Sequence, residues 1–388
     1  MEKRNSVLIT LFILLLMILL LCYPSICLNA AKKGLLLWFN KVLPSLLPFM
    51  ILVNMIVPLG GLNTYIAQLT PLTQRMWKLP GESLLAFIIG LIAGYPMGAK
   101  VIKALYDENK LTMQEAQQTL LFSNNCGPLF IIGTVGTAML GQTQLGVFLF
   151  LIHLLTACLM SLLLTRSLSN PTCSRPKIVF SSTSSSFFKL LNLSVMQSMD
   201  AITCVGGYII LFSVLIAILT SSPIIHTLLA FIKCSSQGRQ LLLGIFSSLL
   251  ELSNGTHALS QLPLSPFSLA LLSAAINFGG ICVYFQTLYV LEDTPFNTKA
   301  LLLAKGIQCL LSSALTLCLY PFYFSISSFA IHNHFSLYTS NTYPIHLLYG
   351  LILFAFCLLC IYFFFGPTHK RIFSIHLFHT LTKKKKLH

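Results

Sequence analysis

Charged side chains are scarce in this sequence. They make up only 9% of its 388 residues, whereas hydrophobic residues make up 56%. Soluble domains carry about 25% charged residues, so this chain has too few to cover a water-exposed surface. Apolar runs of about 20 residues, the length that crosses a bilayer, recur along it. The composition argues against a soluble protein and predicts an all-α, polytopic transmembrane protein surrounded by a lipid bilayer.

The sequence also lacks the residue patterns of catalysis and metal binding. It contains no G-x-S-x-G, H-E-x-x-H or P-loop motif. Its nine acidic residues leave little material for paired acid–base chemistry. Cys357 and Cys360 form a C-x-x-C, but inside an apolar run and without a second pair, and the ten histidines show no ligand spacing. We expect no enzyme and no metal or cofactor, apart from a coupling Na⁺ or H⁺.

Basic residues outnumber acidic ones, giving a net charge of +15. They lie in short segments between apolar runs and in a terminal cluster at 383–386, rather than on one folded face. This distribution is typical of positive-inside membrane topology and argues against a nucleic-acid partner.

Some apolar runs read as plain spans, and others are interrupted. The plain candidates are 5–27, 42–60, 145–167, 201–220, 298–320 and 345–366. We interpret 5–27 as an uncleaved first helix, because its apolar stretch is long for a signal peptide.

Four other segments are interrupted by Gly, Pro and Asn, which loosen the backbone or remove a donor. Two of them, 84–107 and 240–262, consist of arms too short to cross a bilayer and predict re-entrant hairpins. The other two, 112–141 and 267–290, predict broken spans.

Each half of the chain therefore follows the same order of span, hairpin, broken span and span. Since three crossings is an odd number, the second half is inverted relative to the first. The predicted fold is a transmembrane helical protein with inverted repeats, re-entrant hairpins and discontinuous helices. The predicted divisions are an N-terminal helix at 1–32, a first repeat at 33–167, a Ser-rich cytoplasmic linker at 168–200, a second repeat at 201–320, an outer loop and last helix at 321–366, and a basic cytoplasmic tail at 367–388.

The basic residues predict the orientation. With a cytoplasmic N-terminus, 19 of the 24 fall inside, Lys305 among them, and 5 fall outside. We expect a multi-pass protein of the cell membrane with both termini cytoplasmic.

Helix breaks cannot face lipid, because their backbone groups would lack hydrogen-bond partners. We therefore expect the four breaks to meet around a polar site near the midplane. New half-helices are expected to start at Gly98, Pro128, Gly255 and Gly280, and their N-terminal ends favour anions. The candidate solute-binding residues lie at these breaks: Gly94, Tyr95, Pro96, Gly98, Asn124, Asn125, Gly127, Ser253, Asn254, Gly255, Asn277 and Gly279.

Two ionisable residues complete the candidate site. Glu251 is the one acidic residue expected at membrane depth, where carboxylates are costly and usually functional. It is a candidate for ion coupling or solute contact, and the alternative is a carboxyl that caps a helix. Lys100 is the candidate counter-charge, although it could equally extend to the cytoplasmic face.

The stretches 94–100, 123–134 and 251–255 closely resemble the YlbJ sporulation integral membrane proteins of the nucleoside-recognition, or Gate, group, and 37–49 is similar to theirs. The likeness runs over about 33–365. It implies an architecture similar to that of concentrative nucleoside transporters. It also implies export of dipicolinate from the mother cell across the outer forespore membrane during endospore formation.

Three functions stay open. The first is a transporter for a small anionic aromatic solute that works by alternating access. The second is a transporter for nucleosides or related heterocycles, and the third is a non-transporting scaffold for spore envelope or cortex assembly. The substrate, the direction of transport, the coupling ion and the oligomeric state do not follow from the sequence.

Overall fold

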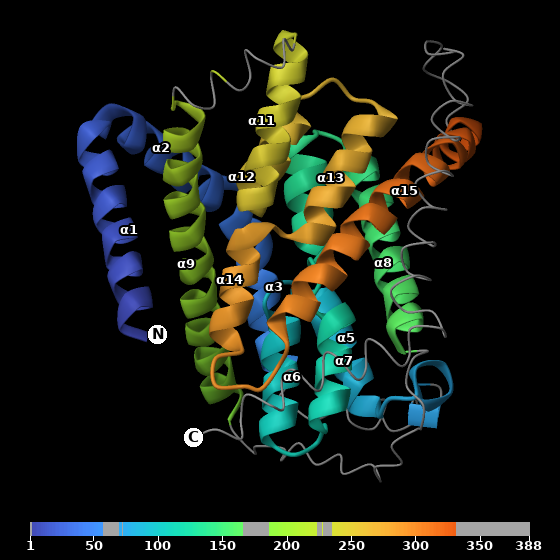
Figure 1. The fold of residues 1–388 in the computed structure, drawn as a ribbon. Helices are drawn as coiled ribbons and strands as arrows, with labels where there is room; N and C mark the ends of the chain where they lie inside the picture. The colour runs from blue at the N-terminus through green and yellow to red at the C-terminus, as the bar shows by residue number, and fades with distance from the viewer. Residues whose placement is uncertain are drawn as a thin grey trace, which may run out of the picture.

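A computed structural model describes residues 2–56, 70–71, 73–165, 186–222, 227 and 235–330, and every regular element in them is a helix (Figure 1). Four helical segments are long and apolar enough to cross a membrane: Thr143–Thr165, Phe187–Thr220, Pro266–Val290 and Thr298–Tyr323. The bent pair Ile13–Cys22 and Pro24–Val42 would make a fifth. The prediction of an all-α, polytopic membrane protein is confirmed.

The first half contains a helical hairpin followed by a broken helix. Helices α5 (Gly81–Ala93) and α6 (Met97–Asp107) form the hairpin, and a turn at the bottom of Figure 1 leads from α6 to α7 (Met113–Ser123). After five residues the chain continues as η2 (Leu129–Met139), which is π-helical, and then as α8 (Thr143–Thr165). Pro128 immediately precedes η2 and, lacking an N–H, suits a helix start.

The second half contains the same order of elements in the opposite direction. Helix α11 (Ser236–Leu250) descends from the top of Figure 1, and α12 (Leu252–Ser260) returns to the top. From there α13 (Pro266–Phe278) and α14 (Gly280–Val290) run down to the bottom. The two hairpins thus enter from opposite ends of the molecule, which is the geometry of inverted repeats.

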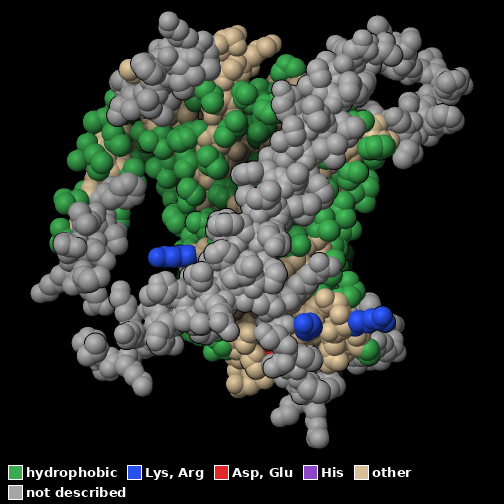
Figure 2. Space-filling model, turned by 45° about the vertical axis from the view of Figure 1, so that its right-hand side comes forward, with side chains coloured by type: hydrophobic (Ala, Val, Ile, Leu, Met, Phe, Trp, Pro, Cys, Tyr) green, Lys and Arg blue, Asp and Glu red, His purple; other side chains and the backbone are tan. Residues whose placement is uncertain are grey.

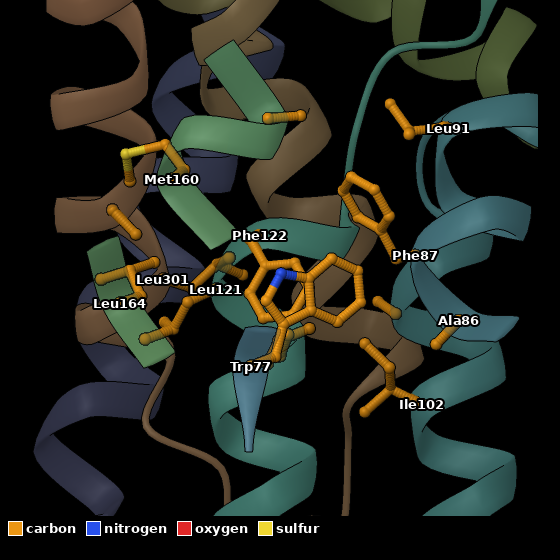
Figure 3. Close-up of a cluster of buried hydrophobic side chains, with 14 of the residues drawn as sticks. Trp77, Ala86, Phe87, Leu91, Ile102, Leu121, Phe122, Met160, Leu164 and Leu301 are labelled. Carbon is orange, nitrogen blue, oxygen red and sulfur yellow. The ribbon is translucent and has the colours of Figure 1, made fainter. Parts of the chain in front are cut away.

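An aromatic cluster anchors the first hairpin to the first broken helix. The Trp77 ring lies 5.3 Å from both Phe87 of α5 and Phe122 of α7, and those two phenylalanine rings are 5.6 Å apart, measured between centroids (Figure 3). All three side chains are buried. Aromatic rings at these separations stabilise the packing in addition to the contribution of the apolar area that they bury. The hairpin and α7 therefore pack as one unit.

The outer surface of the described part is largely apolar. In Figure 2 hydrophobic side chains make up much of the described surface in the upper and middle regions, whereas the visible Lys and Arg side chains lie at mid-height and below. Large exposed hydrophobic residues occur on α1 (Glu2–Cys22), α8 and α9 (Phe187–Thr220). Such a surface suits contact with lipid tails.

The first predicted span ends earlier than expected. Helix α1 stops at Cys22, and α2 (Pro24–Leu37) leaves it at an angle of 103°. The residue before a proline avoids the helical conformation, and Tyr23 has a φ of −123° and a ψ of 53°, which lie outside the helical region. The π-helical η1 (Trp38–Val42) and then α3 (Leu43–Ile56) continue α2, where a span over 42–60 was predicted.

The other departure concerns the linker. Helix α9 begins at Phe187, although the sequence assigned 168–200 to a linker and 201–220 to a span. The early turns are helical because Leu190, Ser194 and Ser198 form a buried stripe at fourfold spacing. Asn54 of α3 donates to the Ser198 hydroxyl over 2.9 Å. The expected span at 345–366, the terminal basic cluster and most of the Ser-rich stretch lie outside the described residues.

Candidate functional site

The tip of the first hairpin packs directly on the first helix break. Gly98 lies against the Ser123 carbonyl, where a Cβ atom would collide with the backbone. Gly94 has a φ of +80°, which favours glycine, and a Cβ there would lie 2.8 Å from the Gly127 nitrogen. Pro96 is the residue before α6. Glycines at the tip therefore allow the backbones of hairpin and break to touch.

The second hairpin packs on the second break in the same way. A side chain at Gly255 would collide with Ser248 of α11, so α11 and α12 touch along their backbones. At the break, Gly280 has a φ of +80°, and a Cβ there would lie 3.2 Å from the Glu251 nitrogen. Each hairpin tip thus lies at the break of its own half.

Tyr95 connects the two halves. It lies at the tip of the first hairpin, yet its hydroxyl donates toward the carbonyls of Ile276 and Asn277 at the second break, over 3.2 and 3.3 Å. Its ring packs against Gly279, whose φ is +82° and where a Cβ would lie 3.3 Å from the ring. Breaks from the two halves therefore meet in space.

A buried hydrogen-bond network lies where they meet. Gln308, on α15 (Thr298–Ala330), donates its two amide hydrogens to Asn125 Oδ1 over 3.0 Å and to Asn277 Oδ1 over 3.2 Å. Asn125 in turn donates to the Phe122 carbonyl, and Asn277 to the Ser273 carbonyl. None of the three amides is accessible to solvent. One side chain of α15 thus ties the first break to the second.

His153 of α8 joins the same network. Its Nδ1 lies 2.8 Å from Asn277 Oδ1, which already accepts from Gln308. An oxygen can only accept, so Nδ1 carries the hydrogen and Nε2 of the neutral ring is an acceptor. Nε2 is buried and has no hydrogen-bond partner in the described structure. The network therefore holds an unused acceptor.

Lys305 places its amino group beside this network. It is 5% exposed, and its Nζ donates to Gln308 Oε1 over 2.7 Å. The Nζ also lies 5.2 Å from the centre of the Tyr95 ring. An ammonium group has three hydrogens to donate, and Gln308 Oε1 accepts only one of them. Among the described residues no carboxylate lies within ion-pair distance of Lys305.

Asn124, the neighbour of Asn125, also reaches the other half. It donates to Thr287 Oγ1 on α14 over 3.0 Å. Its Oδ1 is buried without a partner, as is the Ser123 hydroxyl beside it. Unsatisfied buried polar groups cost about 1–3 kcal/mol each, so two of them side by side are a sign of a binding site.

Glu251 forms a second polar cluster that closes on itself. Its two carboxylate oxygens accept from the backbone nitrogens of Ser253 and Asn254, over 2.8 and 2.6 Å. The Asn254 amide donates both to Glu251 and to Ser213 of α9. Glu251 is thus the N-cap of α12, the alternative that the sequence left open.

Glu251 alone supplies a side-chain cap among the helix starts at the four breaks. The observed starts are Met97, Leu129, Leu252 and Gly280. The starts predicted at Gly98 and Gly255 lie one and three residues after the observed ones, because Pro96 and Glu251 are the N-caps. The start predicted at Pro128 lies one residue before the observed one, because Pro128 is itself the N-cap of η2. The residues before α6, η2 and α14 make no side-chain cap hydrogen bond. Three of the four starts therefore present N-terminal ends that no side chain neutralises.

A comparison with known proteins agrees with this architecture. Over 346 residues the chain is 27% identical to the "Sporulation integral membrane protein YlbJ" of Bacillus subtilis (strain 168), covering 83% of this chain and 85% of that protein. The similarity extends over most of both chains and supports a YlbJ-type membrane protein. No protein-family model and no solved structure gives a significant match. Membership of the nucleoside-recognition group stays a prediction.

The predicted residues of this YlbJ-type protein divide into three sets. Tyr95, Asn125 and Asn277 share the central network, with Asn124 beside it. Ser253 and Asn254 belong to the Glu251 cluster. Lys100 has an exposed side chain and takes no part in either cluster.

Sequence reasoning missed Lys305, Gln308 and His153. Lys305 was assigned to the cytoplasmic side, although it lies about 10 Å along α15 from its start and is buried. An ionisable residue two turns inside an apolar run is itself a signal of function, so the sequence alone could have identified Lys305 as a candidate. His153 lies in an equally apolar run. Nothing in the sequence paired either residue with the breaks.

Proposed function

We propose that this protein transports a small anionic aromatic solute by alternating access, and that the solute is dipicolinate. The observation that carries the proposal is the bridge made by Gln308, which joins Asn125 at the first break to Asn277 at the second. Two interrupted helices of opposite direction share one buried polar centre. Inverted repeats with discontinuous helices at a midplane site are how many secondary transporters are built.

The electrostatics of this centre favour an anion. The N-terminal ends of helices carry partial positive charge, and three of the four starts at the breaks have no side-chain cap. Lys305 adds an amino group that can carry a positive charge, and it has no acidic partner among the described residues. Glu251 uses both oxygens within its own helix turn. A planar dicarboxylate supplies the missing negative charge.

The inverted arrangement suggests how access alternates. Each hairpin enters from its own side and meets the broken helix of its half through glycine contacts. Movement of one hairpin away from the centre would expose the polar network to one side, and movement of the other would expose it to the opposite side. A Na⁺ or proton gradient is the candidate energy source, and the outer forespore membrane is the proposed location.

The test is counterflow of labelled dipicolinate in liposomes containing the purified protein. We expect exchange by the wild type and strong loss in Asn125→Ala, with Gln261→Ala in an exposed turn as the control. Uridine, picolinate and unlabelled dipicolinate are the competitors. Absence of dipicolinate exchange would reject the proposal, and competition by uridine alone would favour a nucleoside transporter.

Expression in B. subtilis cells that lack their YlbJ protein gives a second test. A transporter should restore dipicolinate to spores, and Asn125→Ala should leave it in the mother cell. A scaffold would instead tolerate Asn125→Ala and restore sporulation without any exchange activity in liposomes.

A further inference from the structure

The most unusual group in the described structure is Lys305, a lysine buried in the middle of a helix bundle. Burying an unpaired charge costs several kcal/mol, and lysine usually avoids this by extending its flexible chain to water. Lys305 does not: it is 5% exposed, and its Nζ is held by Gln308 Oε1 and the face of Tyr95. A positive charge on Lys305 therefore requires a compensating partner.

The protein itself does not offer that partner in its described part. Glu251 is the acidic residue at a helix break, and its two oxygens accept from Ser253 and Asn254. Other buried carboxylates lie near the bottom of the molecule, where Glu115 closes the capping box of α7. Gln308 satisfies one donor of Lys305 but carries no charge.

Unsatisfied acceptors lie in the same network and its surroundings. His153 Nε2 and Asn124 Oδ1 are both buried without a partner. His153 is linked to Lys305 through Asn277 and Gln308 by successive hydrogen bonds. The centre thus combines a cation with neutral acceptors, a set that suits a ligand bearing both a carboxylate and polar hydrogen atoms or bridging water.

We infer that Lys305 binds a carboxylate of the transported solute and is the residue that selects anions over neutral heterocycles. The inference rests on the proposed transport function and names the group that recognises the substrate. Gln308 and Tyr95 position the ammonium group, and the solute supplies the charge that the protein lacks. A neutral nucleoside would leave Lys305 uncompensated and would therefore bind weakly.

The experiment measures ligand-induced thermal stabilisation and counterflow in the full-length protein. The probes are dipicolinate with two carboxylates, picolinate with one, and uridine with none. The variants are Lys305→Gln, Lys305→Met and the charge-preserving Lys305→Arg. Lys299→Gln is the matched control, because Lys299 lies on the same helix with an exposed side chain.

We expect both charge-removing variants to lose about 30-fold or more in dipicolinate affinity, as happens when one partner of a buried charge pair is truncated. Lys305→Arg should retain part of the affinity, and Lys299→Gln all of it. Lys305→Met serves where Lys305→Gln does not fold, because an apolar side chain of similar length removes the buried charge.

Undiminished dipicolinate binding by Lys305→Gln or Lys305→Met would overturn the inference while leaving transport intact. The same holds if the wild type binds uridine as tightly as dipicolinate. Failure of the proposed function looks different, since the wild type would then exchange no dipicolinate in liposomes although Lys305-dependent stabilisation by carboxylates persists.

Discussion

Asn125 and Asn277 accept hydrogen bonds from the same amide group, although they lie in different halves of the chain. The two Oδ1 atoms are 3.0 and 3.2 Å from Gln308 Nε2. Asn125 lies just after the end of α7, and Asn277 lies in the last turn of α13. The shared donor therefore fixes how the two breaks face each other. The contact between the two breaks thus depends on one side chain, Gln308, which belongs to α15 and to neither of the broken helices.

Replacing Gln308 with leucine should therefore loosen the centre. Asn125 Oδ1 would lose the amide that donates to it and Lys305 would lose its acceptor, and each buried group left without a partner costs about 1–3 kcal/mol. We expect a clear fall in the Tm of the purified protein together with loss of exchange. Gln261→Leu, in an exposed turn, is the matched control. Equal Tm values for the two variants would show that the bridge contributes little.

Glu251 is expected to act as a helix cap, and its replacements separate that role from ion coupling. Loss of an N-cap costs about 0.5–2 kcal/mol, so Glu251→Ala should lower the Tm. Asp, Asn and Ser are good N-cap residues and should restore most of it. If capping is the whole role, all three also restore exchange. Restoration of exchange by Asp alone, with the Tm restored by all three, would assign the carboxylate a part in transport.

The helix breaks could be predicted because their causes are local. Gly and Pro act on their own backbone, so the interruptions near Gly94, Pro128 and Gly279 follow from a few adjacent residues. The order of elements, and the inversion that follows from it, needs only the count of crossings. The start of α12 was nevertheless misplaced, because the sequence does not show the extended backbone conformation, with a φ of −146°, in which Glu251 caps this helix.

The partners of the breaks could not be predicted, because those contacts are not local. The bond from Gln308 to Asn125 spans 183 positions in the sequence. The buried place of Lys305 likewise depends on Tyr95 and on the packing of α15, whereas a count of basic residues treats every lysine as a loop residue. Composition therefore identifies a membrane protein, and only packing identifies the centre of its site.

Close backbone contact at the first hairpin gives a prediction about Gly98. A methyl group there would meet the Ser123 carbonyl, and neither backbone can move easily. Overpacking of this kind costs about 1–3 kcal/mol, so Gly98→Ala should lower the Tm. Gly207→Ala is the control, because nothing lies within 4 Å of the added atom. Alanine favours helices over glycine by about 1 kcal/mol, and that control should be neutral or more stable. A stable Gly98→Ala would contradict the packing.

Inverted topology gives the last prediction. Asn109 lies in the turn between α6 and α7, and Gln261 in the turn between α12 and α13, and both side chains are exposed. The two hairpins enter from opposite ends (Figure 1), so these turns should lie on opposite sides of the membrane. The chain has 12 cysteines, so each single cysteine is introduced into a cysteine-free background. In intact cells an impermeant maleimide should label Gln261→Cys and leave Asn109→Cys unlabelled until the membrane is opened. Labelling of both cysteines from the same side would contradict the inverted topology. It would also contradict alternating access, because two hairpins that enter from one side cannot expose the centre to both sides of the membrane.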